Sequence, residues 1–293
     1  MVKLLAMKKS QLLVEYKDYL ILRNYSARTI KTYLSSINSF LDFVLVKNDA
    51  DSDVFKYAKS FLIQRFKDGK SWSSVNVDYS SLRILIVNVL GKEWDYEIMP
   101  RPKGKASIPT VLSGKQAESM INVTGNLKHK LILIILYTSG LRVSELIDLD
   151  ISHILNDRLQ LKVEKGKGGK GRVISLPKIT IDAIEFYIQS YKPKKFLLEG
   201  MSQDHMPRCR YSVSSVRKIV VRAAFAVGIK WNVSAHSLRH AFATHHIENG
   251  TDLVTLQQQL GHNSISTTIK YVKFCKTKQR HIHHPIEKLN IKL

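Results

Sequence analysis

The feature that most constrains the fold is the helical spacing of apolar residues, which recurs through the first 90 or so positions. Four segments share this spacing: residues 8–23, 26–45, 53–68 and 72–90. Ser26 and Ser71 stand just before the second and fourth segments, where an N-cap would accept backbone hydrogen bonds. The pattern predicts a small helical domain over residues 1–98.

The composition changes at residues 99–107. Two prolines and a glycine interrupt helical spacing here. Three cations stand among them: Arg101, Lys103 and Lys105. We expect a basic linker whose cations contact phosphates, although a solvated hinge with incidental charge explains these residues equally well. The second domain is expected to cover residues 108–293.

The second domain is predicted to combine helices with a small antiparallel sheet. Residues 159–164 and 172–176 alternate apolar and polar side chains around a glycine- and lysine-rich segment, which is typical of a β-hairpin. Helical spacing covers most of the remainder: residues 113–137, 178–191, 211–227, 236–249 and 251–260. The chain is therefore expected to be mainly α, with an α+β second domain.

The charge of the chain points to a polyanionic partner. Lys and Arg number 46 against 24 Asp and Glu, so the net charge is +22, and the 44% hydrophobic content argues against a disordered basic tail. Double-stranded DNA is the first candidate partner. The longest apolar run, Leu131 to Tyr137, is too short to span a bilayer, and no signal peptide is read. Cys209 and Cys275 show no metal or disulfide spacing, which fits a cytoplasmic protein.

A set of side chains suited to attack on a phosphodiester lies between residues 236 and 271. Such attack builds negative charge on the non-bridging oxygens, and arginine neutralises it with a planar, permanently charged fork. Arg239 follows His236 by three residues, so the two share a helix face, and Arg142 begins another helix after a glycine turn. His236 and His240 have metal-ligand spacing, but Ser237 replaces the Glu of a zinc-protease motif, so no metal is expected.

Five motifs occur in order: Thr138–Leu146, Gly166-Lys167-Gly168, His236-Ser-Leu-Arg239-His240, Leu260-Gly-His262 and Ser266-Thr-Thr-Ile-Lys-Tyr271. With these motifs the chain resembles the tyrosine recombinases of the integrase and Xer-like class over nearly its whole length. The resemblance implies an N-terminal SAM-like core-binding domain that clamps DNA and a C-terminal catalytic domain. No cofactor is expected.

The resemblance also implies a role for each motif residue. Tyr271 would attack the phosphate to form a 3′-phosphotyrosyl bond, while Arg142 and Arg239 clamp the non-bridging oxygens. His236 would accept a proton and His262 would hydrogen-bond the phosphate. Lys167 would protonate the leaving oxygen, with Lys170 as the alternative, and Glu145 would support Arg142. Expected DNA contacts beyond the linker are Lys170, Arg172, Arg217, Lys218 and Arg222.

The function expected from the resemblance is site-specific recombination through a Holliday junction in a DNA-bound homotetramer, with a monomer when free. A tail over residues 274–293 would be exchanged between protomers. The protein would act on the nucleoid and be encoded by a prokaryote or a mobile element. Two alternatives remain open, a type IB-like topoisomerase and an inactive DNA-binding accessory protein. Neither the target sequence nor the choice between integration, resolution and inversion follows from the residues.

Overall fold

The computed structural model describes residues 9–47, 53–104, 110–164, 171–201 and 207–275. The chain divides into two compact units, residues 1–107 and 108–293. Each unit has a hydrophobic core of its own. The predicted mainly helical fold is confirmed, and within the described residues no helix is long and apolar enough to cross a membrane.

The N-terminal unit is built from the four predicted helices. They are α2 (Lys9–Leu22), α3 (Ala27–Lys47), α4 (Val54–Lys67) and α5 (Trp72–Ile84), the last continuing into a π-helical turn, η1 (Leu85–Val89). Both predicted N-caps are present: Ser26 Oγ accepts the amide of Thr29 and Ser71 Oγ accepts the amide of Ser74, each at 3.2 Å.

The apolar faces of these helices meet in one core. Tyr16, Phe40 and Leu82 are completely buried, and the ring of Phe40 meets the ring of Phe61 edge-on at 5.5 Å. The Tyr16 hydroxyl donates to the carbonyl of Ser81 at 3.0 Å, so this buried polar atom is satisfied.

One buried carboxylate lies among the helices of this unit. Asp78 on α5 accepts hydrogen bonds from Ser36 Oγ on α3 at 2.6 Å and from Arg65 Nε on α4 at 2.8 Å. The side chain of Asp78 is only 4% exposed, so these two donors replace the water that the carboxylate loses on folding. Asp78 thereby ties three helices together.

The first residues of the predicted linker pack on the N-terminal unit. Met99 is buried in its core, and its carbonyl accepts a hydrogen bond from the Tyr79 hydroxyl at 3.1 Å. The indole of Trp72 donates to the carbonyl of Pro102 at 2.9 Å. Arg101 and Lys103 are exposed here, while Lys105 lies outside the described residues.

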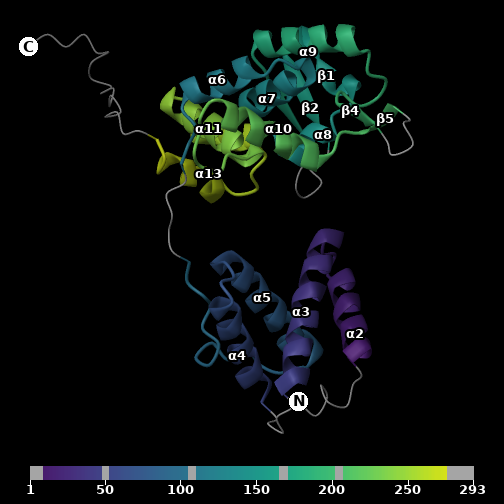
Figure 1. Ribbon diagram of the computed structural model, residues 1–293, viewed down its shortest axis with the longest axis vertical. Coiled ribbons are helices and arrows are strands. Elements are labelled where there is room, and N and C mark those ends of the chain that lie inside the picture. The colour runs from purple at the N-terminus through teal and green to yellow at the C-terminus, as the bar shows by residue number, and fades with distance from the viewer. Residues whose placement is uncertain (1–8, 48–52, 105–109, 165–170, 202–206, 276–293) are drawn as a thin grey trace, which may run out of the picture. The chain divides into compact units, whose positions relative to one another are not determined.

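The C-terminal unit surrounds a strongly apolar helix, α7. Its helices are α6 (Gly114–Val123), α7 (Leu127–Ser139), α8 (Val143–Ile147), α9 (Lys178–Tyr191), α10 (Val213–Ala226), α11 (Ala235–Glu248), α12 (Leu253–Leu260) and α13 (Ile265–Val272), with short 3₁₀ turns η2 (Ile151–His153) and η3 (Asn156–Arg158). Five apolar residues of α7 are completely or almost completely buried: Leu131, Ile132, Leu133, Ile135 and Leu136. Helices α6, α9, α10 and α11 pack around α7 (Figure 1).

The predicted hairpin is confirmed as part of a three-stranded antiparallel sheet. Strand β2 (Gln160–Val163) pairs with β1 (Ile154–Leu155) and with β3 (Arg172–Ser175). Leu161 faces Ile174 in register, and both side chains are buried against the core. The hairpin tip, residues 165–170, lies outside the described residues.

A second, two-stranded sheet was not predicted. Strands β4 (Glu199–Met201) and β5 (Pro207–Arg210) pair antiparallel with an irregular register at Gly200 and Met201. The three residues of β4 include a glycine and β5 begins with a proline, and both residue types are depleted in strands, which is why the pattern missed them.

Helices α11, α12 and α13 enclose a small third cluster of buried side chains. Phe242 of α11, Leu256 and Leu260 of α12, and Tyr271 of α13 pack together there. Tyr271 therefore lies on α13, which packs beside α11, the helix that carries His236 and Arg239.

Candidate active site

Helix α11 presents three polar side chains on one face. Ser234 caps the helix by accepting the amide of Ser237 at 3.3 Å, which fixes where its first turn begins. His236, Arg239 and His240 follow at the three- and four-residue spacing that aligns side chains on a helix. All three line a cleft of 330 Å³.

Arg239 is the most deeply buried charge described in this unit. Only 1% of the residue is exposed, and its guanidinium donates to the carbonyls of Gly140 and Leu260. Its Nη2 also lies 3.0 Å from His262 Nε2. Burial and the nearby charge of Arg142 lower the pKa of Arg239 to about 10, so it remains a cation at neutral pH.

Gly140 is required where the chain approaches Arg239. It ends α7 in the left-handed conformation at φ 61°, and a Cβ here would lie 2.5 Å from Phe242 Cδ1. This turn aims the Gly140 carbonyl at Arg239 and leads directly into Arg142, the N-cap of α8.

The hydrogen bonds of His262 define its protonation. Because arginine only donates, His262 Nε2 accepts from Arg239, so the ring proton is on Nδ1, 2.9 Å from Thr268 Oγ1. Burial lowers the pKa of His262 to about 4, with the charges of Arg239, Arg142 and Arg172 acting in the same direction. His262 is therefore neutral near pH 7.

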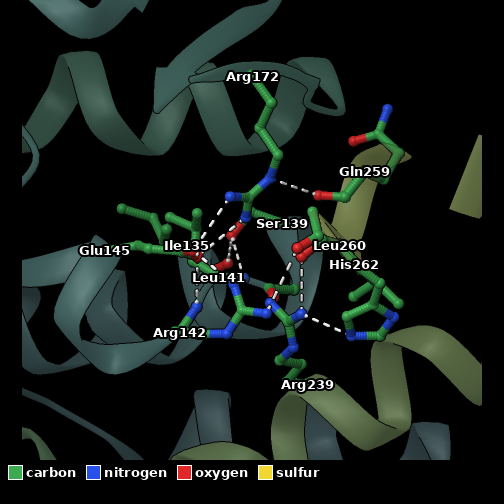
Figure 2. A network of polar contacts seen from close by, with 12 residues as sticks. Ile135, Ser139, Leu141, Arg142, Glu145, Arg172, Arg239, Gln259, Leu260 and His262 are labelled. Atoms are coloured by element: carbon green, nitrogen blue, oxygen red, sulfur yellow. Dashed lines mark hydrogen bonds and ion pairs between the residues drawn. The ribbon is translucent and has the colours of Figure 1, made fainter. Parts of the chain in front are cut away.

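Glu145 is a buried carboxylate shared by two arginines (Figure 2). Its Oε1 accepts Arg142 Nη1 at 2.7 Å and Arg172 Nη1 at 3.0 Å. Its Oε2 accepts the Arg142 amide and Arg172 Nη2, each at 2.9 Å. Burial by itself raises the pKa of Glu145, but hydrogen bonds from Arg172 and Arg142 outweigh it and hold the pKa at about 2.

Three successive carbonyls at the end of α12 accept from three different arginines (Figure 2). Arg172 Nε donates to Gln259 at 2.9 Å, Arg239 Nη2 to Leu260 at 2.7 Å, and Arg142 Nη2 to Gly261 at a long 3.5 Å. The last carbonyls of a helix have no partner within it and carry partial negative charge. The end of α12 therefore offers acceptors to the whole arginine cluster.

Tyr271 lines the same cleft as the arginines and histidines. The residue is 5% exposed, and its ring lies almost parallel to that of His262, with centroids 6.1 Å apart. The ring of His240 meets it at 5.3 Å. Thr267, Lys270 and Phe274 complete the lining of the cleft.

The other two histidines of the cleft are also held neutral. Desolvation and the charges of Arg239 and Arg142 lower the pKa of His236, so its imidazole is free to accept a proton at neutral pH. Desolvation, His236 and Arg239 lower the pKa of His240 to about 4. The Nδ1 atom of His240 is buried and has no hydrogen-bond partner among the described residues.

The structure brings together most of the residues that were given catalytic or supporting roles from the sequence. Five line the cleft: Arg142, His236, Arg239, His262 and Tyr271. Glu145 lies directly behind Arg142. Lys167 and Lys170 lie outside the described residues.

The expected DNA contacts fall in different settings. Arg217, Lys218 and Arg222 are exposed on α10, and Arg101 and Lys103 are exposed on the N-terminal unit. Arg172 is instead engaged inside the protein, where its side chain is 11% exposed and pairs with Glu145.

Three residues of the site were not assigned roles from the sequence. His240 was considered only as a metal ligand, although its position four residues after His236 already placed it on the same helix face. Lys270 directly precedes Tyr271, and Thr268 forms the hydrogen bond to His262, but no sequence signal distinguishes that threonine. In the part of the chain that the structure describes, no cluster of His, Cys, Asp and Glu suits a metal ion.

Comparison with known families covers both units. The profile of the phage integrase family matches residues 110–278, and the profile of the phage integrase N-terminal SAM-like domain matches residues 12–96. The second match agrees with the SAM-like character expected of the N-terminal helices.

Individual relatives span nearly the whole chain. Tyrosine recombinase XerA of Pyrococcus horikoshii is 33% identical over 282 residues, covering 96% of this chain and 94% of the relative. The crystal structure of XerA recombinase, at 25% identity, covers 89% of this chain and 93% of its own with a TM-score of 0.51. XerH site-specific recombinase bound to palindromic difH substrate, at 22% identity, shares the fold with a TM-score of 0.71, covering 87% of this chain and 78% of its own.

Proposed function

The chain belongs to the phage integrase family, and on this premise we propose that it is a tyrosine-type site-specific recombinase that acts on double-stranded DNA. The observation that carries the proposal is the single cleft in which Tyr271 lies with two arginines and three histidines. A tyrosine beside fixed cationic donors is suited to attack a phosphodiester, because those donors neutralise the charge that develops on the phosphate.

The proposed reaction is a reversible transesterification. The Tyr271 oxygen bonds to phosphorus while the bond from phosphorus to the 5′ oxygen breaks, leaving a 3′-phosphotyrosyl link and a 5′ hydroxyl. The tyrosine proton passes to His236, and Arg142 and Arg239 hold the non-bridging oxygens. One phosphoester replaces another, so religation by a 5′ hydroxyl needs no nucleotide cofactor.

The leaving 5′ oxygen needs a proton, and Lys167 is proposed as its donor. Lys167 belongs to the segment that joins β2 to β3, and Lys170 in the same segment is the alternative. Arg172 begins β3 just after this segment and pairs with Glu145 behind Arg142. This connection supports a lysine from the hairpin acting at the same phosphate as Arg142.

The domain roles and the assembly are part of the proposal. Residues 1–98 would clamp DNA together with the basic linker at 99–107, and residues 108–293 would carry the catalysis. Arg101, Lys103, Arg217, Lys218 and Arg222 are exposed cations that support phosphate contact. Four protomers would bind two DNA sites, exchange their tails at 274–293, and pass through a Holliday junction.

A nicked suicide substrate tests the proposal. Loss of a short fragment beside the nick prevents religation, so the wild-type protein should accumulate a covalent protein–DNA adduct on its cognate site. Tyr271→Phe should form none, whereas Tyr187→Phe, a change at a buried tyrosine on α9, should leave adduct formation intact. An adduct formed by Tyr271→Phe would overturn the assignment of the nucleophile. Relaxation of any supercoiled plasmid without joining of two sites would indicate a topoisomerase instead.

A further inference from the structure

All three guanidinium nitrogens of Arg172 donate hydrogen bonds inside the protein. Nη1 and Nη2 donate to the two carboxylate oxygens of Glu145 at 3.0 and 2.9 Å, and Nε donates to the carbonyl of Gln259 at 2.9 Å. The two parallel bonds to Glu145 form the bidentate geometry that only an arginine provides. A side chain with 11% exposure and three occupied nitrogens offers little to a phosphate at the surface.

Arg172 is also packed against the turn that ends α12. Gly261 occupies this turn at φ 62°, and a Cβ on Gly261 would lie 2.8 Å from Arg172 Nη1 and 3.0 Å from its Cδ and Cζ. The absence of a side chain at Gly261 is therefore what lets the guanidinium reach Glu145 past α12. The contact is built from three parts of the chain: β3, α8 and the α12 turn (Figure 2).

The partner of Arg172 is also the partner of Arg142. Glu145 accepts four hydrogen bonds, two from Arg172 and two from the amide and Nη1 of Arg142. Without Arg172, the buried carboxylate would retain only the donors of Arg142 and would draw that side chain inward. Arg142 is 25% exposed, lines the cleft and has donors left over for a phosphate.

We propose that Arg172 is a positioning residue that holds Arg142 in its phosphate-binding orientation by sharing Glu145 and fixing the end of α12. The inference rests on the proposed function of Arg142 as a phosphate ligand. It replaces the expectation that Arg172 itself contacts DNA.

Two substitutions separate charge from geometry. Arg172→Lys keeps a cation beside Glu145 but provides one point donor instead of a fork, so it cannot satisfy both carboxylate oxygens and Gln259 together. Arg172→Gln removes the charge as well. The thermal midpoint should fall less for Arg172→Lys than for Arg172→Gln, whereas both should slow the chemistry.

The first measurement uses the nicked suicide substrate at saturating protein. Single-turnover adduct formation should be slower by on the order of 100-fold for both variants, as expected for a displaced catalytic group. DNA affinity and its dependence on salt should match wild type. Lys162 on neighbouring β2 has a side chain that is 53% exposed and pairs with exposed Glu164. Lys162→Gln should change neither the rate of adduct formation nor the DNA affinity, and it serves as the matched control.

Salt dependence identifies the competing role. The slope of log K against log[salt] is negative, and a lost phosphate contact reduces its magnitude by about 0.9. Arg222→Gln on the exposed face of α10 should show such a reduction. A salt-dependence slope of smaller magnitude for the Arg172 variants, with an unchanged rate of adduct formation at saturating protein, would assign Arg172 to the DNA surface and overturn the inference.

A second measurement needs no DNA. In the free wild-type protein, the ¹H–¹⁵N signals of Arg142 Nη1 and Nη2, which donate to Glu145 and Gly261, should be sharp and slow to exchange, and Arg172→Lys should broaden or shift them. An unchanged Arg142 signal would refute the inference even if cleavage slows. If wild type forms no adduct on any nicked site, the proposed function fails, and the signal alone then decides whether Arg172 positions Arg142.

Discussion

Arg239 donates a 3.0 Å hydrogen bond from Nη2 to Nε2 of His262. The bond fixes the neutral tautomer of the histidine, with its Nδ1 proton directed at Thr268. In the free site, three acceptors take the donors of Arg239: the carbonyls of Gly140 and Leu260 and the ring of His262. A bound phosphate oxygen would compete with His262 for Arg239, and the imidazole would then be able to protonate and donate to the phosphate.

The protonation of His262 should therefore respond to an anion. In the free protein, the His262 ring should titrate near its lowered pKa of about 4, well below the ordinary value of about 6.5. Binding of DNA should raise that pKa, because a phosphate favours the imidazolium. NMR of ¹³C-labelled histidine, with His262→Gln to assign the signal, measures both midpoints. A free-protein midpoint near 6.5 would contradict the hydrogen-bond pattern.

Mild acid should destabilise the C-terminal unit. His240 and His262 have folded-state pKa values of about 4, below about 6.5 in the unfolded chain, so between these values the unfolded chain binds more protons. Their contribution to stability is complete above pH 6.5 and is lost as pH falls toward 4. The thermal midpoint should decrease from pH 7.5 to pH 5, and His240→Gln should flatten that decrease. If the thermal midpoint of His240→Gln depended on pH as it does in wild type, the pKa of His240 would not be lowered by folding.

Thr268 should matter through its hydroxyl. It is completely buried, and Thr268→Val keeps the shape but removes the acceptor for His262 Nδ1. We expect a loss of about 1 kcal/mol in the free energy of unfolding and slower adduct formation, because the His262 tautomer is no longer fixed. Thr268→Ser retains the hydroxyl and should stay close to wild type in both urea denaturation and cleavage. Equal defects in the two variants would point to packing instead.

Gly261 should tolerate no side chain. Gly261→Ala adds a Cβ 2.8 Å from Arg172 Nη1 in a backbone conformation at φ 62° that L residues rarely adopt. Gly228→Ala is the matched control, since it has φ 73° but open space around the added methyl. The control isolates the backbone cost, about 1 to 2 kcal/mol. Gly261→Ala should lose more than this in thermal unfolding and should also lose cleavage, whereas Gly228→Ala should keep it.

Asp78 should control the stability of the N-terminal unit. Asp78→Ala leaves Ser36 and Arg65 without their acceptor, which should cost about 2 to 3 kcal/mol. Hydrogen exchange of peptides from α3, α4 and α5 should accelerate, while peptides from α7 and α11 should not change. Asp18→Ala, at an exposed position on α2, is the control and should leave exchange unaltered. Unchanged exchange in Asp78→Ala would mean that the network adds little to stability.

Local pattern was sufficient to predict most helices. Apolar spacing placed α2, α3, α4, α5 together with η1, and α9 through α12 within about two residues, because the buried stripe of a helix repeats with its own geometry. The hairpin strands followed from alternation for the same reason. Strands β4 and β5 carry no such signal, because β4 contains Gly200 and β5 begins with Pro207, residue types that are depleted in strands.

Contacts between distant parts of the chain could not be predicted in this way. Arg172 and Glu145 are 27 residues apart. The sequence pattern of a hairpin does not distinguish a basic residue that faces solvent from one that pairs with a buried acid. Met99 illustrates a similar limit: the prolines beside it indicate a helix end, but not that Met99 is buried in the helical core. The motif order identified Arg142, His236, Arg239, His262 and Tyr271, whereas only the fold shows that they line one cleft.

The end of α12 sets a limit on how this protein can be engineered. The carbonyls of Gln257 and Gln258 accept the amides of His262 and Gly261. The next three carbonyls, of residues 259, 260 and 261, accept hydrogen bonds from Arg172, Arg239 and Arg142 in that order. Each residue of an α-helix is rotated by about 100° from the one before it. A single insertion or deletion within α12 would therefore turn every one of these acceptors away from its arginine at once. The register of these eight residues, Leu253–Leu260, is therefore closed to design.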